Sequence, residues 1–297
     1  MKLLLRFVVA LLFISGLSTL LTSCASNEIV FTPLITSSKQ GDVESVNELI
    51  ASGADVNEKN KYNETALLYA ADNGYIEVVK TLIASGANLN DQEISGRTAL
   101  SYAAGKGHLD IVEALIFGGA DVNSGKNLAG TALIDASGNG HLEVIKALIA
   151  SGADVNAESL SGRTALLHAS SQGHIEVVKE LIANDADVNA SIHTVATLFD
   201  AVFEGVTPLL LAVGNGHYEV AKELIAGGAD VNVKNLIGET ALMKVVNSEN
   251  THMIQVLIAN GIDVNAENNE GETALSIATN KKHLKIIELL KEAGAKK

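Results

Sequence analysis

Residues 53–57 read Gly53-Ala54-Asp55-Val56-Asn57, and close variants of this pentapeptide recur through the chain. The later copies end at Asn90, Asn123, Asn156, Asn189, Asn232 and Asn265. Successive asparagines are 33 residues apart, except for the 43 residues between Asn189 and Asn232. A period in this range is typical of a stack of small units that share one continuous core. The pentapeptide therefore predicts a solenoid, a fold that normally serves as a recognition surface.

Each interval between two pentapeptides predicts a pair of short helices. In the second interval, Thr65 is a suitable N-cap for the helix-forming run of residues 66–71, and Asn73-Gly74 then breaks the chain. Residues 76–83 follow with apolar side chains at helical spacing. Gly86 is placed to end this second helix in the left-handed conformation. A polar stretch, residues 91–97, leads to the next threonine.

Two further motifs recur in phase with the pentapeptide. Thr-Ala-Leu or Thr-Pro-Leu begins at residues 32, 65, 98, 131, 164, 207, 240 and 273, and Gly-His begins at residues 107, 140, 173 and 216. With these motifs the chain resembles the ankyrin repeat family. The resemblance implies an all-α solenoid of about eight helix–turn–helix repeats, with a projecting finger loop between repeats. The repeats are expected at residues 32–57, 58–90, 91–123, 124–156, 157–189, 190–232, 233–265 and 266–297, the last being a polar C-terminal cap.

One departure from the family pattern concerns the contacts between fingers. The histidine that usually follows Thr-Pro-Leu in the family is replaced in these repeats, for example by Leu68 and Ser101. The replacement puts in doubt the usual hydrogen bond that ties neighbouring loops together.

The amino terminus does not fit the repeats. Lys2 and Arg6 precede an apolar run from Phe7 to Leu21, which is typical of a secretory signal peptide over residues 1–23. Residues 21–24, Leu-Thr-Ser-Cys, resemble a bacterial lipobox, which implies cleavage before Cys24 and its acylation. Residues 24–31 would then be a short tether to the membrane. An uncleaved signal anchor or a coincidental cysteine stays open as an alternative.

The lipobox resemblance implies a lipid-anchored protein of the bacterial cell envelope. Ala25 follows the cysteine, where an aspartate would resemble an inner-membrane retention signal. We therefore expect the outer membrane, with the protein facing the periplasm. Display on the cell surface remains open.

Charge and motifs limit the classes of function. The chain carries 21 basic and 35 acidic residues, a net charge of −14. This balance argues against nucleic acid and against docking on anionic lipid through charge. The sequence holds no nucleophile elbow, phosphate-binding glycine loop or zinc-protease motif. We expect no catalysis, no cofactor, no metal and no small-molecule substrate.

One histidine recurs at the same place in successive repeats: His108, His141, His174, His217 and His283. Stacked helical layers lie ~10 Å apart, whereas a zinc–nitrogen bond is about 2 Å long. A single row therefore cannot supply two ligands to one ion, and we interpret these residues as structural turn histidines.

A different position varies strongly between repeats. It is held by Tyr69, Tyr102, Asp135, His168, Leu211, Lys244 and Ile277. In proteins of the ankyrin family, this position faces the concave groove. Variation at one position within a constant frame is expected of a binding surface, although drift at exposed positions would look the same. We expect Tyr69, Tyr102, Asp135, His168 and Leu211 to contact a protein partner.

The 43-residue step adds ten residues to one finger, residues 190–206. In this insert Ile192, Val195, Phe199, Val202 and Val206 recur at helical spacing and predict an apolar stripe, flanked by Phe203. Two interpretations are open: the stripe covers itself on adjacent fingers, or Phe199 and Phe203 dock a partner. Beside the insert, Asp185 replaces the glycine that ends the other second helices. If Asp185 adopts the left-handed conformation, the cost relative to glycine is about 1 kcal/mol, and we expect the repeat to survive.

The sequence therefore predicts a membrane-tethered module that binds a protein partner in the bacterial envelope through its groove and fingers. The alternative is a surface-displayed adhesin that contacts a host or neighbouring cell.

Overall fold

The computed structural model describes residues 31–125, 130–192 and 205–296. The described part contains sixteen α-helices, arranged as eight pairs, and a single isolated β-bridge. This confirms the predicted all-α fold. Among the helices of the described residues, none is long and apolar enough to cross a membrane. Cys24, Phe199 and Phe203 lie outside the described residues.

In each pair, the first helix begins one residue after the recurring threonine. These helices are α2 (Pro33–Gln40), α4 (Ala66–Asp72), α6 (Ala99–Lys106), α8 (Ala132–Asn139), α10 (Ala165–Gln172), α12 (Pro208–Gly214), α14 (Ala241–Val246) and α16 (Ala274–Lys281). The second helices are α3 (Val43–Ala51), α5 (Ile76–Ala84), α7 (Leu109–Phe117), α9 (Leu142–Ala150), α11 (Ile175–Ala183), α13 (Tyr218–Ala226), α15 (Thr251–Ala259) and α17 (Leu284–Glu292).

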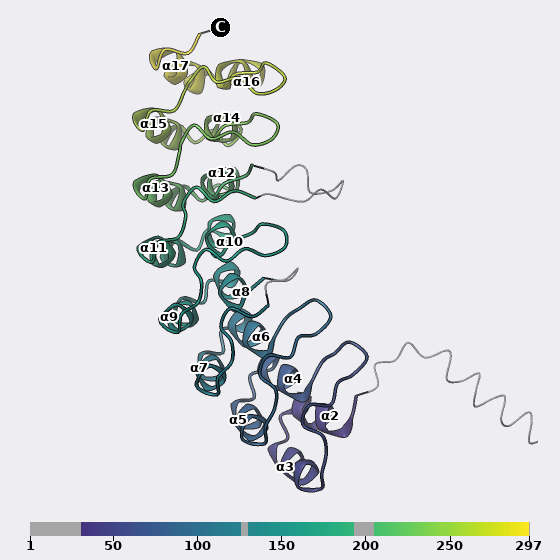
Figure 1. The fold of residues 1–297 in the computed structure, drawn as a ribbon. Helices are drawn as coiled ribbons and strands as arrows, with labels where there is room; N and C mark the ends of the chain where they lie inside the picture. The colour runs from purple at the N-terminus through teal and green to yellow at the C-terminus, as the bar shows by residue number, and fades with distance from the viewer. Residues whose placement is uncertain (1–30, 126–129, 193–204, 297) are drawn as a thin grey trace, which may run out of the picture.

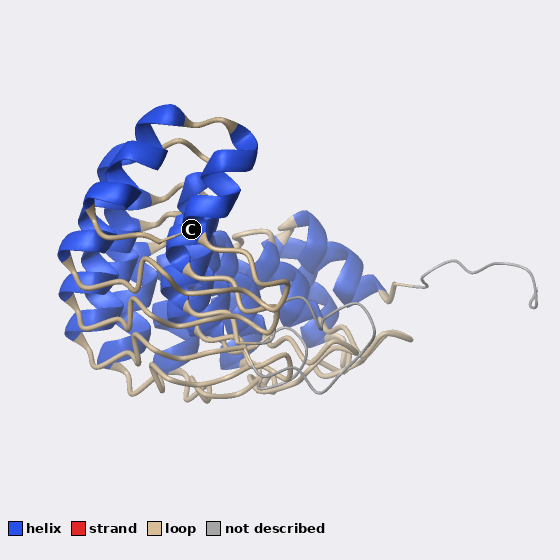
Figure 2. Cartoon of the chain, turned by 90° about the horizontal axis from the view of Figure 1, so that it is seen from above, coloured by secondary structure: helices blue, strands red, loops and turns tan. Residues whose placement is uncertain are grey.

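The helix pairs stack into an arc. Figure 1 shows the first helices in one column and the second helices in another, with the first helices on the inner side of the arc. The fingers project from the side of the first helices, and Figure 2 shows that they lie along one edge of the stack. The inner helices and the described finger residues therefore share the concave side of the stack.

The core runs along the stack between the two columns. In the second repeat, Leu67 and Leu82 are almost fully buried, and Val78 and Val79 have no exposed surface. Each such leucine contributes roughly 1.5–3 kcal/mol when its side chain leaves water. Alanines, among them Ala70, Ala103, Ala136 and Ala169, complete the buried side of the first helices. No repeat can bury its apolar faces alone, because the neighbouring repeat supplies the covering surface.

Threonine caps and left-handed residues set the ends of the helices. The Thr65 hydroxyl accepts a hydrogen bond from the Leu68 N–H at 3.3 Å, as predicted. Equivalent threonines cap the other first helices, with Thr131 as the exception. Gly86 has φ 85°, and Asp185 has φ 64° at the equivalent place. Asp185 therefore takes the left-handed conformation of the glycine that it replaces.

The pentapeptide ties each repeat to the next. The Asp121 carboxylate accepts a hydrogen bond from the Asn123 N–H at 2.9 Å and closes a local turn. The Asn123 side chain then donates to the Gly152 carbonyl at 3.0 Å and accepts from the Asp154 N–H at 2.8 Å, both in the next repeat. The same two bonds are made by Asn57, Asn156, Asn189, Asn232 and Asn265. Asn90 makes the second of them, in which its side-chain oxygen accepts from the Asp121 N–H. These asparagines hold together the bases of neighbouring fingers.

The Gly-His motif makes a second tie. The Nε2 atom of His141 lies 3.1 Å from the carbonyl oxygen of Gly105, and His174 and His217 repeat the contact with Gly138 and Ser171. The His141 ring also lies over Gly107, where an added Cβ would come within 2.6 Å of Nδ1. Glycine is therefore needed at this place both for φ of 78° and for the ring of the next repeat.

The two ends of the long finger differ from the predicted helical stripe. In the regular fingers, a polar residue such as Asn60 or Ser159 donates its N–H to the carbonyl four residues later. In the long finger, the Ile192 N–H donates to the Val206 carbonyl at 3.1 Å, and both side chains are buried in the core. The prediction that Ile192 and Val206 belong to a helical stripe is wrong, because they form an antiparallel closing pair. Val195 and Val202 lie outside the described residues.

The asparagine tie can be tested at the middle of the stack. We expect Asn123→Ala to lower the free energy of unfolding by about 1–2 kcal/mol, because two hydrogen bonds are lost and a backbone donor and acceptor lose their partner. Urea unfolding followed by circular dichroism measures the change. Glu158→Ala, on an exposed finger residue, is the control and should have no measurable effect. Equal stability of the two variants would show that the asparagine bonds do not couple the repeats.

Candidate functional site

The concave surface carries one row of dissimilar side chains. Its members lie four residues after the capping threonine: Tyr69, Tyr102, Asp135, His168, Leu211, Lys244 and Ile277. All seven are partly buried, whereas the residue that follows each of them is buried. The following residue packs into the core, so the row itself faces the inner side of the stack. The structure thus places the five described partner-binding candidates on one continuous surface.

The N-terminal end of the row is an aromatic and cationic cluster. The Phe31 and Tyr69 rings meet edge to face with centroids 5.5 Å apart, and Lys39 Nζ lies 4.6 Å from the Phe31 centroid and 5.1 Å from that of Tyr69. The Tyr69 hydroxyl donates to a Glu64 carboxylate oxygen at 2.6 Å. Burial and this carboxylate raise the pKa of Tyr69, so the phenol stays protonated as a donor.

The next layers are joined by Arg97. Its guanidinium lies 5.6 Å from the Tyr102 ring centroid and donates to Asp135 Oδ1 at 3.2 Å. The Asp135 side chain is only 12% exposed, and burial raises its pKa to about 6 although Arg97 opposes the shift. Arg97 thus connects the Tyr102 and Asp135 positions of adjacent repeats. Sequence reasoning missed this residue, although its position just before the threonine also varies between repeats.

Two glycines of the first helices lie next to groove side chains of the following repeat. A Cβ added at Gly105 would lie 3.4 Å from Asp135 Cβ, and one at Gly138 would lie 3.4 Å from His168 Nδ1. Glycine lowers helix stability by roughly 1 kcal/mol relative to alanine. Because 3.4 Å is an ordinary van der Waals contact, an alanine would also fit at either place. Burial, helped by Arg163, lowers the pKa of His168 to about 4. His168 is therefore neutral near pH 7.

Three hollows follow the row along the groove. One of about 60 Å³ lies between Tyr69 and Tyr102, one of about 420 Å³ between Tyr102 and Asp135, and one of about 220 Å³ beside Leu211 and Lys244. Each acid that lines them has a partner. Asp72 lies 3.9 Å from Lys106, and Glu239 lies 2.9 Å from Lys244, in addition to the pairs of Glu64 and Asp135 described above. The groove is therefore polar but nearly balanced in charge.

Titratable side chains of the row are engaged by neighbouring residues. The Tyr69 phenol and the Asp135 carboxyl are both held by neighbours. In residues 31–125, 130–192 and 205–296, no group of three or more His, Cys, Asp and Glu residues is arranged to hold a metal ion. The candidates Phe199 and Phe203 lie outside these ranges, as does the lipidation candidate Cys24.

The raised pKa of Asp135 predicts a pH dependence. An aspartate in the unfolded chain has a pKa near 3.9, so between about pH 4 and 6 the folded protein binds the extra proton and loses stability as pH rises. We expect the free energy of unfolding of the wild type to fall, relative to Asp135→Asn, on the order of 2 kcal/mol between pH 4 and 7. The lowered pKa of His168 makes the free energy of unfolding rise with pH, but this contribution is the same in the wild type and in Asp135→Asn and cancels in the comparison. Chemical denaturation across this pH range measures the difference, and parallel curves would contradict the burial of Asp135.

Comparison with known proteins agrees with this geometry. The chain is similar to the ankyrin repeat domain of human ASB11 in a crystal structure, with a TM-score of 0.66, 25% sequence identity, and coverage of 78% of this chain and 99% of that chain. A search of curated proteins finds no match. A family model described as ankyrin repeats, three copies, matches residues 10–93, 34–126, 101–192, 133–235 and 209–297. The chain therefore belongs to the ankyrin repeat family.

Proposed function

We propose that this chain is a protein-recognition module that binds a protein partner in its concave groove without chemical turnover. The observation that carries the proposal is the row from Tyr69 to Ile277, where seven repeats place six different residue types while the residue after each stays buried. The fold does not need these side chains in particular, because seven repeats build the same helix around different residues. A partner that spans several repeats would meet a different contact in each.

The groove also indicates what kind of segment binds. The chain has a net charge of −14, but the acids of the groove are paired with Arg97, Lys106 and Lys244 or with the Tyr69 phenol. Because these charges are already compensated, a strongly basic segment gains little there. Tyr69, Tyr102 and the amide of Asn139 favour a segment with apolar and neutral polar side chains.

We place the module in the bacterial envelope, as a further part of the proposal. The signal-like residues 1–23 and the lipobox-like residues 21–24 support lipidation at Cys24, with the outer membrane and its periplasmic side as the expected location. Only residues 25–31 would separate the anchor from the first repeat. Two acyl chains hold a protein stably on a membrane, which one chain does not.

The runner-up function is a surface-displayed adhesin that contacts a host or neighbouring cell. It shares the fold, the groove and the lipid anchor with the first proposal. It differs only in the side of the outer membrane that the repeats face.

Partner capture tests the groove. We expect a photo-crosslinking amino acid in place of Tyr102, expressed in intact cells, to give a discrete covalent complex, because this side chain lines two of the hollows. The same group in place of Lys146, exposed on the outer helix α9, is the control. The complex should weaken when Tyr69→Ala is added. Identical products from both positions would argue against recognition by the groove.

Cell fractionation tests the anchor and the side of the membrane. We expect the wild type to sediment with the outer membrane and to incorporate labelled palmitate, and Cys24→Ser to lose both properties. Protease added to intact cells should leave the repeats intact if they face the periplasm. Degradation under these conditions would favour the adhesin, and a wild-type protein that is membrane-bound but takes up no palmitate label would indicate an uncleaved signal anchor.

A further inference from the structure

Helix α7 departs from the other second helices at its last residue. Six second helices end in alanine: Ala51, Ala84, Ala150, Ala183, Ala226 and Ala259. In α7 this place is taken by Phe117, whose side chain is 96% exposed. Because alanine suffices for the fold in six repeats, the aromatic ring is not needed for packing. A single exposed ring is common on protein surfaces, but one that adjoins further apolar surface belongs to a patch of the kind that marks binding sites.

Helix α7 also differs from neighbouring second helices in the charge of its outer face. In α5, α9, α11 and α13, a glutamate and a lysine three residues later form an ion pair, as Glu77 and Lys80 do at 2.9 Å. In α7 the equivalent residues are Asp110 and Glu113, both acidic and both exposed. Neither takes part in an ion pair among the described residues. The outer face of α7 thus carries two uncompensated negative charges, whereas these neighbours are neutral there.

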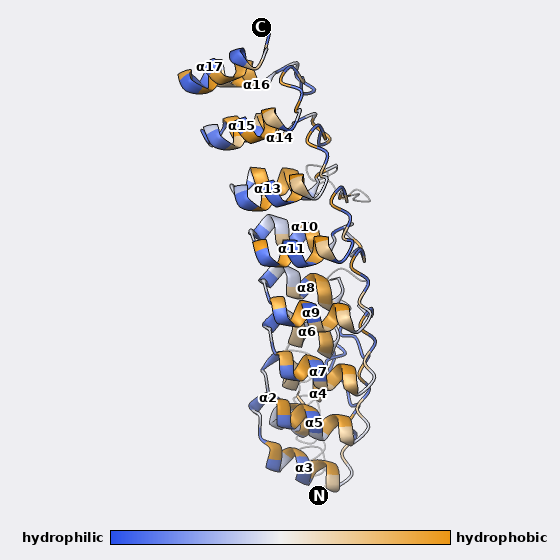
Figure 3. Cartoon of the chain, turned by 90° about the vertical axis from the view of Figure 1, so that its left-hand side faces the viewer, coloured by the Kyte–Doolittle hydropathy of each residue, from blue (hydrophilic) through white to orange (hydrophobic). Residues whose placement is uncertain are grey.

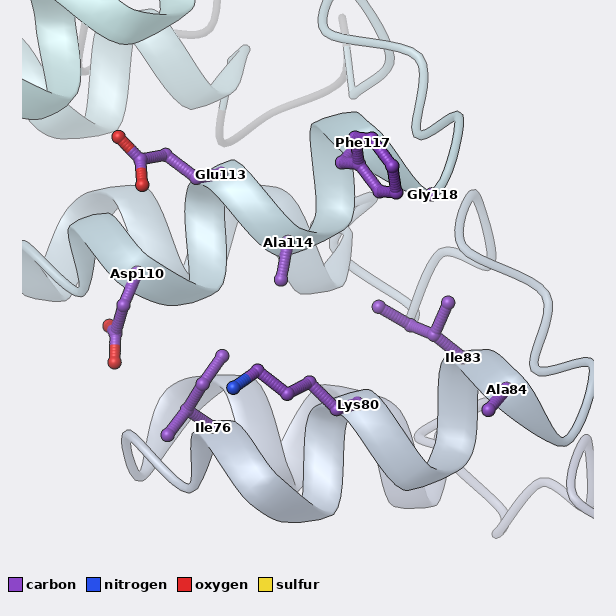
Figure 4. A pocket seen from close by; sticks show the side chains of 9 residues that line it. All are labelled: Ile76, Lys80, Ile83, Ala84, Asp110, Glu113, Ala114, Phe117 and Gly118. Carbon is purple, nitrogen blue, oxygen red and sulfur yellow. The ribbon is translucent and has the colours of Figure 1, made fainter.

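The aromatic ring and the acids border one hollow. Figure 4 shows Asp110 and Ala114 of α7 pointing toward the α5 residues Ile76, Lys80 and Ile83. Glu113 points away from α5, and Phe117 lies at the end of α7; both residues border the hollow. The hollow measures about 630 Å³, and Ile76, Ile83 and Ala114 give it apolar walls. Figure 3 looks onto the second helices, so this surface lies on the opposite side of the stack from the groove of the first helices.

We propose that this outer surface, made of Phe117, the hollow between α5 and α7, Asp110 and Glu113, docks a basic amphipathic helix of a second partner. An apolar side chain of that helix would enter the hollow beside Phe117. Lysine or arginine residues flanking it would pair with Asp110 and Glu113. A second copy of this chain fits poorly, because it would place the same acids against each other.

Binding of a designed probe tests the surface. The full chain is titrated into a fluorescent helical peptide of leucine and lysine at physiological salt, and a peptide of leucine and glutamate is the charge control. We expect the basic peptide to bind and the acidic one not to bind. Phe117→Ala and Glu113→Lys should each weaken binding about tenfold or more. Both variants should fold, since each installs the residue that neighbouring repeats already carry.

Two further variants separate this site from general attraction and from the groove. Glu48→Lys, on exposed α3, changes the net charge as Glu113→Lys does and should alter the affinity by less than about twofold. Tyr102→Ala should leave the affinity unchanged. The proposal is overturned if Phe117→Ala binds like the wild type, or if Glu48→Lys weakens binding as much as Glu113→Lys. It is also overturned if sedimentation shows self-association that Phe117→Ala abolishes, since the occupant is then a second copy.

Discussion

The side-chain amide at the end of each pentapeptide joins one repeat to the next, and the regular stack depends on this bond. Asn123 donates to one backbone group of the following repeat and accepts from another, and its equivalents do the same along the chain, except Asn90, for which only the accepting bond is seen. Such a bond requires that the next finger base lie at one fixed distance and orientation. The insertion in the long finger keeps this condition, because Ile192 and Val206 close the finger before the extra residues can move its base. Asn189 accordingly reaches Gly228 and Asp230 as the others reach their partners.

Because one set of residues holds the stack together, the remaining surface positions can vary and form the binding surfaces. Buried leucines, alanines and threonines, with the asparagine and histidine ties, hold the frame, so the inner row and the outer faces of the second helices are free to vary. On the inner side this freedom gives the Tyr69 cluster, the Arg97–Asp135 pair and the neutral His168. On the outer side it gives Phe117 and the acids of α7. The two surfaces differ in character, since the groove is balanced in charge and the outer face of α7 is not.

The sequence predicts the features that repeat and misses those that depend on distant pairs. Periodicity is sufficient for the helix pairs, the threonine caps and the left-handed residue at Asp185, because these are local. The pentapeptide predicts the solenoid from its period alone, but its bonds join residues 29 and 31 positions apart, which only the stacked repeats bring together. Arg97 pairs with an aspartate 38 residues away, which no local pattern indicates. The stripe through Ile192 and Val206 failed because helical spacing cannot be distinguished from an antiparallel closing pair without the fold.

Hydrogen–deuterium exchange of the chain, alone and with its captured partner, tests the central claim that the varying inner positions form the binding surface. The account predicts added protection in the first helices α4, α6, α8 and α10 and in the fingers that precede them. The backbone amides of α13, α15 and α17 should exchange at the same rate with and without the partner. Protection confined to residues outside the groove, with α4 to α10 unchanged, would contradict the account.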